Sequence, residues 1–276
     1  MQQIIDENYC LVEPRILGLI VLYDKWRAPQ ALNYFRHILG LLSSKSHLAS
    51  ISNSDDISFS DFKGSNLCGE FSGWNELLSL FAIENFDIII FANDTFAQYD
   101  RFNNFDVKHF RKAMLELNQS KFMLGEISWG IDYSELLKCN RFLLRYVRTS
   151  IFACSSSAIQ CIKEIALAPQ AIDSLVHFAS EKSLAFDPSV PRLFCKRIEA
   201  WLFGKNDKNR WHSAPSASSG RLLLKAKCVL QELLLSRRCE DNSIGVFSYK
   251  CKSIARHHLF TLIYKIQNLF FYVKLP

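Results

Sequence analysis

The pattern of hydrophobic and polar positions predicts strands and helices in turn along the N-terminal third of the chain. Residues 16–23 and 87–92 are continuous apolar runs rich in Ile and Val, which is typical of strands buried on both faces. Residues 29–42 repeat apolar side chains at helical spacing, and residues 47–52 form another short strand. A loop rich in Ser, Gly and Asn then leads to a helix over residues 74–81. Strands joined by crossover helices predict an α/β fold with a mostly parallel sheet flanked by helices.

The pattern in the rest of the chain is more helical. It predicts helices over residues 109–117, 134–147, 151–166, 192–203, 222–235 and 253–274. The last helix carries a continuous apolar stripe opposite basic side chains such as Arg256 and Lys265. The sequence SAPSASSG at residues 213–220 is typical of a linker. We therefore expect a body formed by residues 1–212 and a basic helical tail formed by residues 221–276.

Composition and charge narrow the class of protein. Of the 276 residues, 49% are hydrophobic and 22% are charged, which is ordinary for a globular protein. No secretory signal and no apolar run of about 18 residues is seen, so we expect no membrane span. The nine cysteines are scattered without CxxC spacing, so we expect reduced core cysteines rather than a metal or disulfide framework. Together these features predict a cytoplasmic protein.

The net charge of +6 is concentrated at the C-terminal end of the chain. Residues 221–276 hold ten Lys or Arg and three Asp or Glu, and such asymmetry indicates an anionic partner. Because the basic side chains are interleaved with an apolar stripe and the body is not basic, nucleic acid is the less favoured partner. The stripe predicts either an amphipathic helix on the inner face of the plasma membrane or one packed on the body.

Polar residues follow three of the predicted strands. They are Asp24, residues 53–56 and the pair Asn93–Asp94, and ligands bind at the carboxyl ends of parallel strands. One interpretation of Asp94 is a turn or helix-capping residue. The other is a solvent-facing carboxylate at a cleft, where it holds a magnesium ion that phosphate oxygens complete. The residues alone leave both interpretations open.

The order of the short motifs resembles family 2 glycosyltransferases with the GT-A fold. The nearest likeness is to glycosyltransferase-like proteins of bacterial surface-polysaccharide clusters, including the rhamnan-synthesis type. It covers residues 15–212 and depends on Val21–Asp24 (VLYD), Ile51–Ser54 (ISNS), Gly64–Asn66 (GSN), Glu70–Trp74 (EFSGW), Asn93–Thr95 (NDT) and Trp129–Gly130 (WG).

This resemblance implies transfer of a sugar, with inversion, from a nucleotide diphosphate to an O-antigen or capsule acceptor. It implies that Asp94 holds Mg²⁺ or Mn²⁺ against the diphosphate. Glu126 and Asp132, which flank Trp129–Gly130, are candidates for the catalytic base, and the other interpretation of each is a surface carboxylate. The donor would be bound by Tyr23, Asp24, Asn53, Asn66, Asn93 and Trp129, although Trp129 is also explained as a core residue.

The chain departs from the family pattern in two ways. Asn93 and Thr95 flank Asp94, so the usual Asp-x-Asp pair has lost one carboxylate. No Glu-Asp pair of the kind that supplies the usual base is present. These departures leave open an alternative function, which is a non-catalytic glycosyltransferase-like partner in a polysaccharide assembly complex.

Overall fold

The computed structural model describes residues 13–99, 102–117, 120–129, 145–180, 183–203 and 217–250. Within them, a seven-stranded sheet has the order β3-β2-β1-β4-β6-β5-β9, and β7 pairs with β8 separately. The strands are β1 (Ile16–Leu22), β2 (Ser46–Ser52), β3 (Phe62–Lys63), β4 (Ile88–Asn93), β5 (Phe122–Trp129), β6 (Arg145–Ser155), β7 (Val176–Ser180), β8 (Ser183–Phe186) and β9 (Gly245–Ser248). In the large sheet, β6 is antiparallel to both neighbours and the other described pairs are parallel. The predicted α/β class, a mostly parallel sheet flanked by helices, is confirmed.

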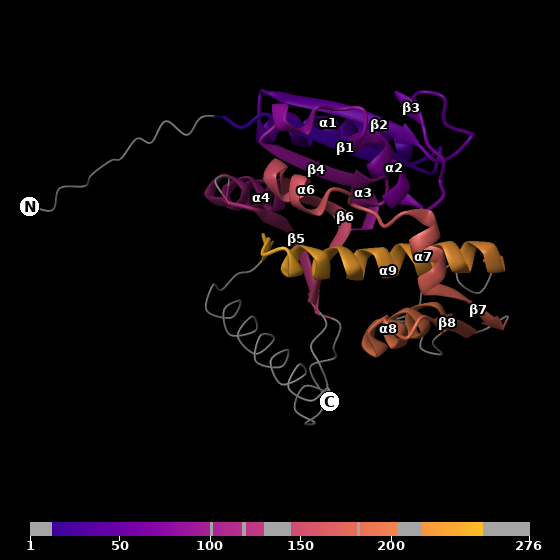
Figure 1. Cartoon of the computed structure of the whole chain (residues 1–276). Helices are drawn as coiled ribbons and strands as arrows, with labels where there is room; N and C mark the ends of the chain where they lie inside the picture. The colour runs from indigo at the N-terminus through magenta and orange to yellow at the C-terminus, as the bar shows by residue number, and fades with distance from the viewer. Residues whose placement is uncertain are drawn as a thin grey trace, which may run out of the picture.

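Helices cover both faces of this sheet (Figure 1). They are α1 (Ala28–Leu42), α2 (Glu70–Leu78), α3 (Phe96–Tyr99), α4 (Asn104–Leu117), α6 (Ser156–Ile162), α7 (Pro169–Leu175), α8 (Arg192–Phe203) and α9 (Ser219–Asp241), with a 3₁₀ turn at Ile83–Asn85. One face packs on α1, α3 and α4, and the other packs on α2, α6 and α9. In Figure 1, α9 lies between the large sheet and the group formed by α8 and the β7–β8 pair, and α7 crosses α9 in this view.

The central strands are buried on both faces, which explains their continuous apolar sequences. Along β1, Leu17, Leu19 and Val21 enter the core beneath α2 and α9. Their neighbours Ile16 and Ile20 point to the opposite core, beneath α1 and α4. Since successive side chains of a strand point to opposite faces, an apolar residue is needed at every position.

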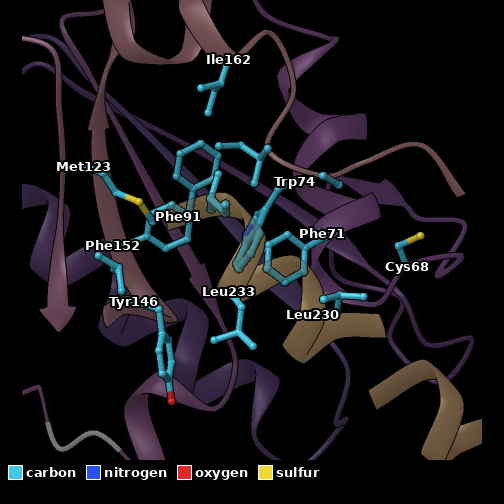
Figure 2. Packing of buried hydrophobic residues seen from close by; sticks show 14 of the residues in the cluster. Cys68, Phe71, Trp74, Phe91, Met123, Tyr146, Phe152, Ile162, Leu230 and Leu233 are labelled. Carbon is cyan, nitrogen blue, oxygen red and sulfur yellow. The ribbon is translucent and has the colours of Figure 1, made fainter. Parts of the chain in front are cut away.

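The core beneath α2 is built around Trp74, which is fully buried. Its indole ring meets Phe71, Phe91 and Phe152 edge to face at centroid distances of 5.2, 5.8 and 5.4 Å (Figure 2). The indole N–H donates to the backbone oxygen of Ala92 at 3.0 Å, so the one polar atom of the ring is satisfied inside the core. This packing fixes α2 against the carboxyl end of β4.

Helix α9 takes the place of a strand along part of β6. Because β4 pairs only with residues 151–155, the N-terminal half of β6 extends beyond it. There the backbone N–H groups of Val147 and Thr149 donate to Ser236 Oγ at 2.9 Å and to Glu232 Oε1 at 2.8 Å. Four residues of a helix and two residues of a strand both advance by about 6 Å, so the two spacings match.

Three predictions about the second half are wrong for the described residues. Residues 151–166, predicted as a helix, form the end of β6, the helix α6 and a loop, and residues 145–147 of the helix predicted at 134–147 are strand. The boundary predicted at the linker of residues 213–220 does not separate residues 221–250 from the body, because α9 packs in the core and β9 pairs with β5. The helix predicted over residues 253–274 lies outside the described residues. In the first half of the chain, the helix predicted to begin at Trp74 begins at Glu70.

Replacing Ser236 with alanine tests this placement of α9. The variant leaves the buried N–H of Val147 without its acceptor, so we expect the free energy of unfolding to fall by about 1–3 kcal/mol in urea denaturation. Ser174→Ala in α7 is the matched control, because that hydroxyl is exposed and bonds within its own helix. We expect the control to stay within about 0.5 kcal/mol of the parent protein. Equal effects of the two substitutions would contradict the packing of α9 on β6.

Candidate functional site

The strand order reverses between β1 and β4, which makes this the topological switch point of the sheet. From β1 the chain adds β2 and β3 on one side, and β4 lies on the other. Crevices outside the carboxyl ends of strands at such a point bind ligands in open α/β sheets. The predicted residues Asp24, Asn53 and Asp94 all follow strands at this edge, as the sequence indicates.

Asp94 closes the gap between the two strands instead of facing a cleft. Its carboxylate oxygen Oδ2 accepts the backbone N–H groups of Tyr23 and Asp24, both at 2.8 Å. Its own N–H donates to the oxygen of Val21 at 3.1 Å. The expectation of a solvent-facing carboxylate is wrong, because Asp94 is only 1% exposed. Burial raises its pKa even though the two backbone hydrogen bonds act to lower it.

The geometry around Asp94 does not fit the divalent cation that the resemblance implies. Oδ2 is engaged by two amide hydrogens, and the remaining oxygen, Oδ1, is enclosed without a hydrogen-bond partner. Among the residues that the structure describes, no group of three His, Cys, Asp or Glu side chains is placed to hold a metal ion. A magnesium ion needs six oxygen ligands in an octahedron, and a single enclosed carboxylate oxygen leaves no room for the other ligands. As placed here, Asp94 is therefore a poor ligand for a divalent cation.

The other predicted residues at this edge make local contacts. Asp24 accepts the N–H of Trp26 at 2.9 Å and pairs with Arg27 at 2.9 Å, at the start of α1. Burial acts to raise the pKa of Asp24, but these partners outweigh burial and lower it. Asn53 donates its amide hydrogens to Tyr23 Oη at 3.0 Å and to the oxygen of Gly69 at 2.9 Å. These side chains hold the β1, β2 and α2 ends together.

Asn66 also lies in this region, in the loop before α2. Its φ of 54° is in the left-handed range that Asn tolerates, and its Oδ1 is buried without a hydrogen-bond partner. The next turn is fixed by Gly69, whose φ is 60°. A Cβ at Gly69 would lie 2.4 Å from Cys228 Sγ, so the loop fits against α9 only with glycine there.

A cavity of about 510 Å³ opens beside the switch point, at the carboxyl ends of β4 and β5. Of the predicted site residues, Asn93 and Glu126 line it. The walls also come from the N-terminal half of β6 and from α8 and α9, where α9 replaces a strand. Six charged side chains from five elements line this cavity: Glu70, Glu126, Arg148, Arg197, Lys225 and Glu232.

Glu232 is the acid of the cavity that is best suited to proton transfer. Burial raises its pKa to about 7, with the nearby Glu70 acting in the same direction and the Thr149 N–H opposing. Its hydrogen bonds to described residues, from the N–H and Oγ1 of Thr149 at 2.8 and 3.2 Å, both end on Oε1. A carboxyl group with a pKa near neutrality exchanges a proton readily at physiological pH, as a general base must.

Glu126, the sequence-predicted base, has two cationic partners. Its Oε2 lies 2.8 Å from Lys250 Nζ and 3.5 Å from Arg148 Nη1. It therefore connects β5, β6 and the turn that follows β9 at the edge of the cavity. Asp132, the second predicted base, lies outside the described residues, as does the side chain of Trp129 at the end of β5. The aromatic residues that line the cavity are Tyr146 and Trp201.

Lys225 and Glu70 bring opposite charges to the cavity near Asp94. Burial acts to lower the pKa of Lys225, but the nearby Glu70, Cys228 and Asp94 outweigh burial and raise it. Lys225 is therefore a cation at neutral pH. Lys225 of α9 and Asn93 at the end of β4 both line the cavity. The side-chain oxygen of Asn93 accepts the backbone N–H of Thr95 at 3.1 Å.

Sequence reasoning missed Glu232 and Lys225 because both lie on the helix expected to be part of a separate tail. The sequence does carry a signal for Glu232, which is the one carboxylate in the apolar run VLQELLL. Burying a carboxylate costs free energy unless it is paired or hydrogen-bonded, so an acid at such a position indicates a specific role.

Across the described residues, none of the helices has both the length and the apolar character needed to cross a bilayer. The six described cysteines are all free thiols. Scans against protein-family models, curated proteins and solved structures found no match to the chain.

Proposed function

We propose that this protein is a GT-A-type glycosyltransferase that moves a sugar from a nucleotide diphosphate to a surface-polysaccharide acceptor. The observation that carries the proposal is the cavity at the carboxyl ends of β4 and β5, with Glu232 of pKa about 7 and three cationic side chains in its walls. The resemblance of the strand-end motifs to family 2 glycosyltransferases supplies the reaction class. The cavity volume of about 510 Å³ lies within the usual range for small-molecule sites.

The proposed reaction is a direct displacement at the anomeric carbon of the donor sugar. An acceptor hydroxyl oxygen forms the new bond to that carbon, while the bond to the diphosphate oxygen breaks and its electron pair leaves with the nucleoside diphosphate. Glu232 takes the proton of the attacking hydroxyl, in place of the sequence-predicted Glu126. Trp201 offers an apolar wall for the sugar ring, which is one of the two roles that the sequence leaves open for Trp129.

We expect a nucleoside diphosphate to stabilise the full chain against heat. A ligand that binds only the native state adds about 2.7 kcal/mol at a hundredfold excess over its dissociation constant. The measurement is a thermal-shift screen of UDP, GDP and dTDP and their sugars, each with EDTA, with Mg²⁺ and with Mn²⁺. Hits are then incubated with glycan or lipid-linked acceptors, and mass spectrometry looks for the added sugar. Absence of any shift with every nucleotide would remove the basis of the proposal.

The second candidate function is a non-catalytic glycosyltransferase-like partner of a polysaccharide assembly complex. The observation that favours it is the structural use of Asp94, whose Oδ2 ties β4 to β1, together with the missing second carboxylate of the metal motif. The two candidates differ in turnover. A protein that binds a nucleotide sugar but neither transfers nor hydrolyses the sugar fits the second candidate.

A further inference from the structure

The charges around the cavity indicate an anionic ligand. Arg148, Arg197 and Lys225 line its walls, and arginine stays protonated at any physiological pH. Of the three acids, Glu232 is only partly ionised near neutrality, because its pKa is about 7. Glu126 is already engaged with Arg148 and with Lys250. The walls therefore carry a small excess of positive charge at neutral pH.

Lys225 differs from the other cations by its position. Arg148 is paired with Glu126, and Arg197 Nη2 donates to Tyr146 Oη at 3.4 Å, both on the side of β5 and β6. Lys225 lines the cavity together with Glu70 of α2 and Asn93 at the end of β4, and the nearby groups that raise its pKa are Glu70, Cys228 and Asp94. The end of β4 borders the switch point, and ligands of open α/β sheets bind outside the strand ends at such a point.

We propose that Lys225 binds the diphosphate of the donor directly, in the place that the resemblance gives to a metal ion on Asp94. The inference deepens the proposed function and rests on it for the identity of the ligand. An ammonium group is a compact charge that binds phosphate oxygens well, and its charge-assisted hydrogen bonds are stronger than neutral ones. It neutralises the charge that develops on the departing diphosphate, while the Asp94 carboxylate holds the strand ends in position.

Lys225→Gln and Lys227→Gln form a matched pair on α9. Lys227 has the same chemistry two residues further along the helix, but it pairs with Asp173 of α7 and does not line the cavity. The full chain is titrated calorimetrically with UDP, GDP, dTDP and inorganic diphosphate, in EDTA and again with Mg²⁺. Unfolding midpoints of each variant report whether the fold is kept, and Lys225→Arg restores the charge.

We expect the probes to bind the parent protein in EDTA. Lys225→Gln should lower their affinity by about tenfold or more, because it removes one charged hydrogen bond. Lys227→Gln should bind within about twofold of the parent protein, and Lys225→Arg should recover part of the lost affinity. The uncharged nucleoside should bind the parent and Lys225→Gln equally, because it has no phosphate for the ammonium to contact.

The outcomes separate this inference from the proposed function. Nucleotide binding that needs Mg²⁺ and is equal in the two glutamine variants overturns the role of Lys225 and leaves the function standing. Lys225-dependent binding of inorganic diphosphate, with no nucleotide bound or sugar transferred, supports the anion site and overturns the function. Failure of the folded parent protein to bind any probe overturns both.

Discussion

Replacing Asp94 with alanine is expected to lower the free energy of unfolding by about 2–4 kcal/mol, measured by urea denaturation. The substitution removes the acceptor of two backbone N–H groups, those of Tyr23 and Asp24, at a site that is almost fully buried. Each buried donor left without a partner costs about 1–3 kcal/mol. The gain from no longer burying a carboxylate offsets part of that loss.

Two variants give this result its meaning. Asp94→Asn keeps an acceptor oxygen for the two amides, so we expect it to retain most of the stability that alanine loses. Asp56→Ala removes an exposed carboxylate of the same edge, whose distance to Lys25 is 4.0 Å, and should change stability by no more than about 0.5 kcal/mol. If Asp94→Ala unfolds at the same urea concentration as the parent protein, Asp94 is not the tie between β1 and β4.

The first half of the fold is predictable because its strands are buried on both faces. The predicted limits of β1, β2, β4 and α1 agree with the structure to within one or two residues, since continuous apolar runs and a helical repeat dominate their sequences. The sequence does not predict the strand β6, because the two halves of the strand lie in different surroundings and no single hydrophobic pattern runs along it. Residues 151–155 are enclosed by neighbouring strands, whereas Arg148 is exposed and residues 147 and 149 bond to α9.

The site was predictable in place but not in detail. The polar residues after β1, β2 and β4 lie at one edge of the sheet, as predicted, because the carboxyl ends of parallel strands meet there. The role of Asp94 depends on amide groups some seventy residues away in the chain, and no local pattern reports such a partner. Glu232 and Lys225 reach the cavity only because α9 lies along β6, which is a tertiary contact rather than a property of the helix sequence.

The raised pKa of Glu232 makes a prediction about stability that is independent of activity. Because its folded-state pKa of about 7 lies above the ordinary value of 4.5, the folded protein binds the proton more tightly than the unfolded chain. Its contribution to stability is therefore complete below pH 4.5 and is lost as the pH rises through about 7. Glu232→Gln cannot ionise, yet it keeps an acceptor oxygen for Thr149. We expect the parent protein to lose on the order of 1–3 kcal/mol relative to this variant between pH 5 and pH 8, in urea denaturation.

Glu232→Gln should also lower the rate of sugar transfer by about 10²–10⁴-fold, the usual contribution of a general base. In the parent protein the rate should rise with pH through about 7 as Glu232 loses its proton, and the variant should lack that rise. Glu126→Gln is the decisive comparison, because Glu126 lines the same cavity and is one of the two candidate bases named from the sequence. If Glu126→Gln abolishes the rise and Glu232→Gln keeps it, the sequence-based assignment is correct. If Glu232→Gln shows the stability difference but transfers sugar at the parent rate, its carboxyl group is only the anchor of the Thr149 amide on α9.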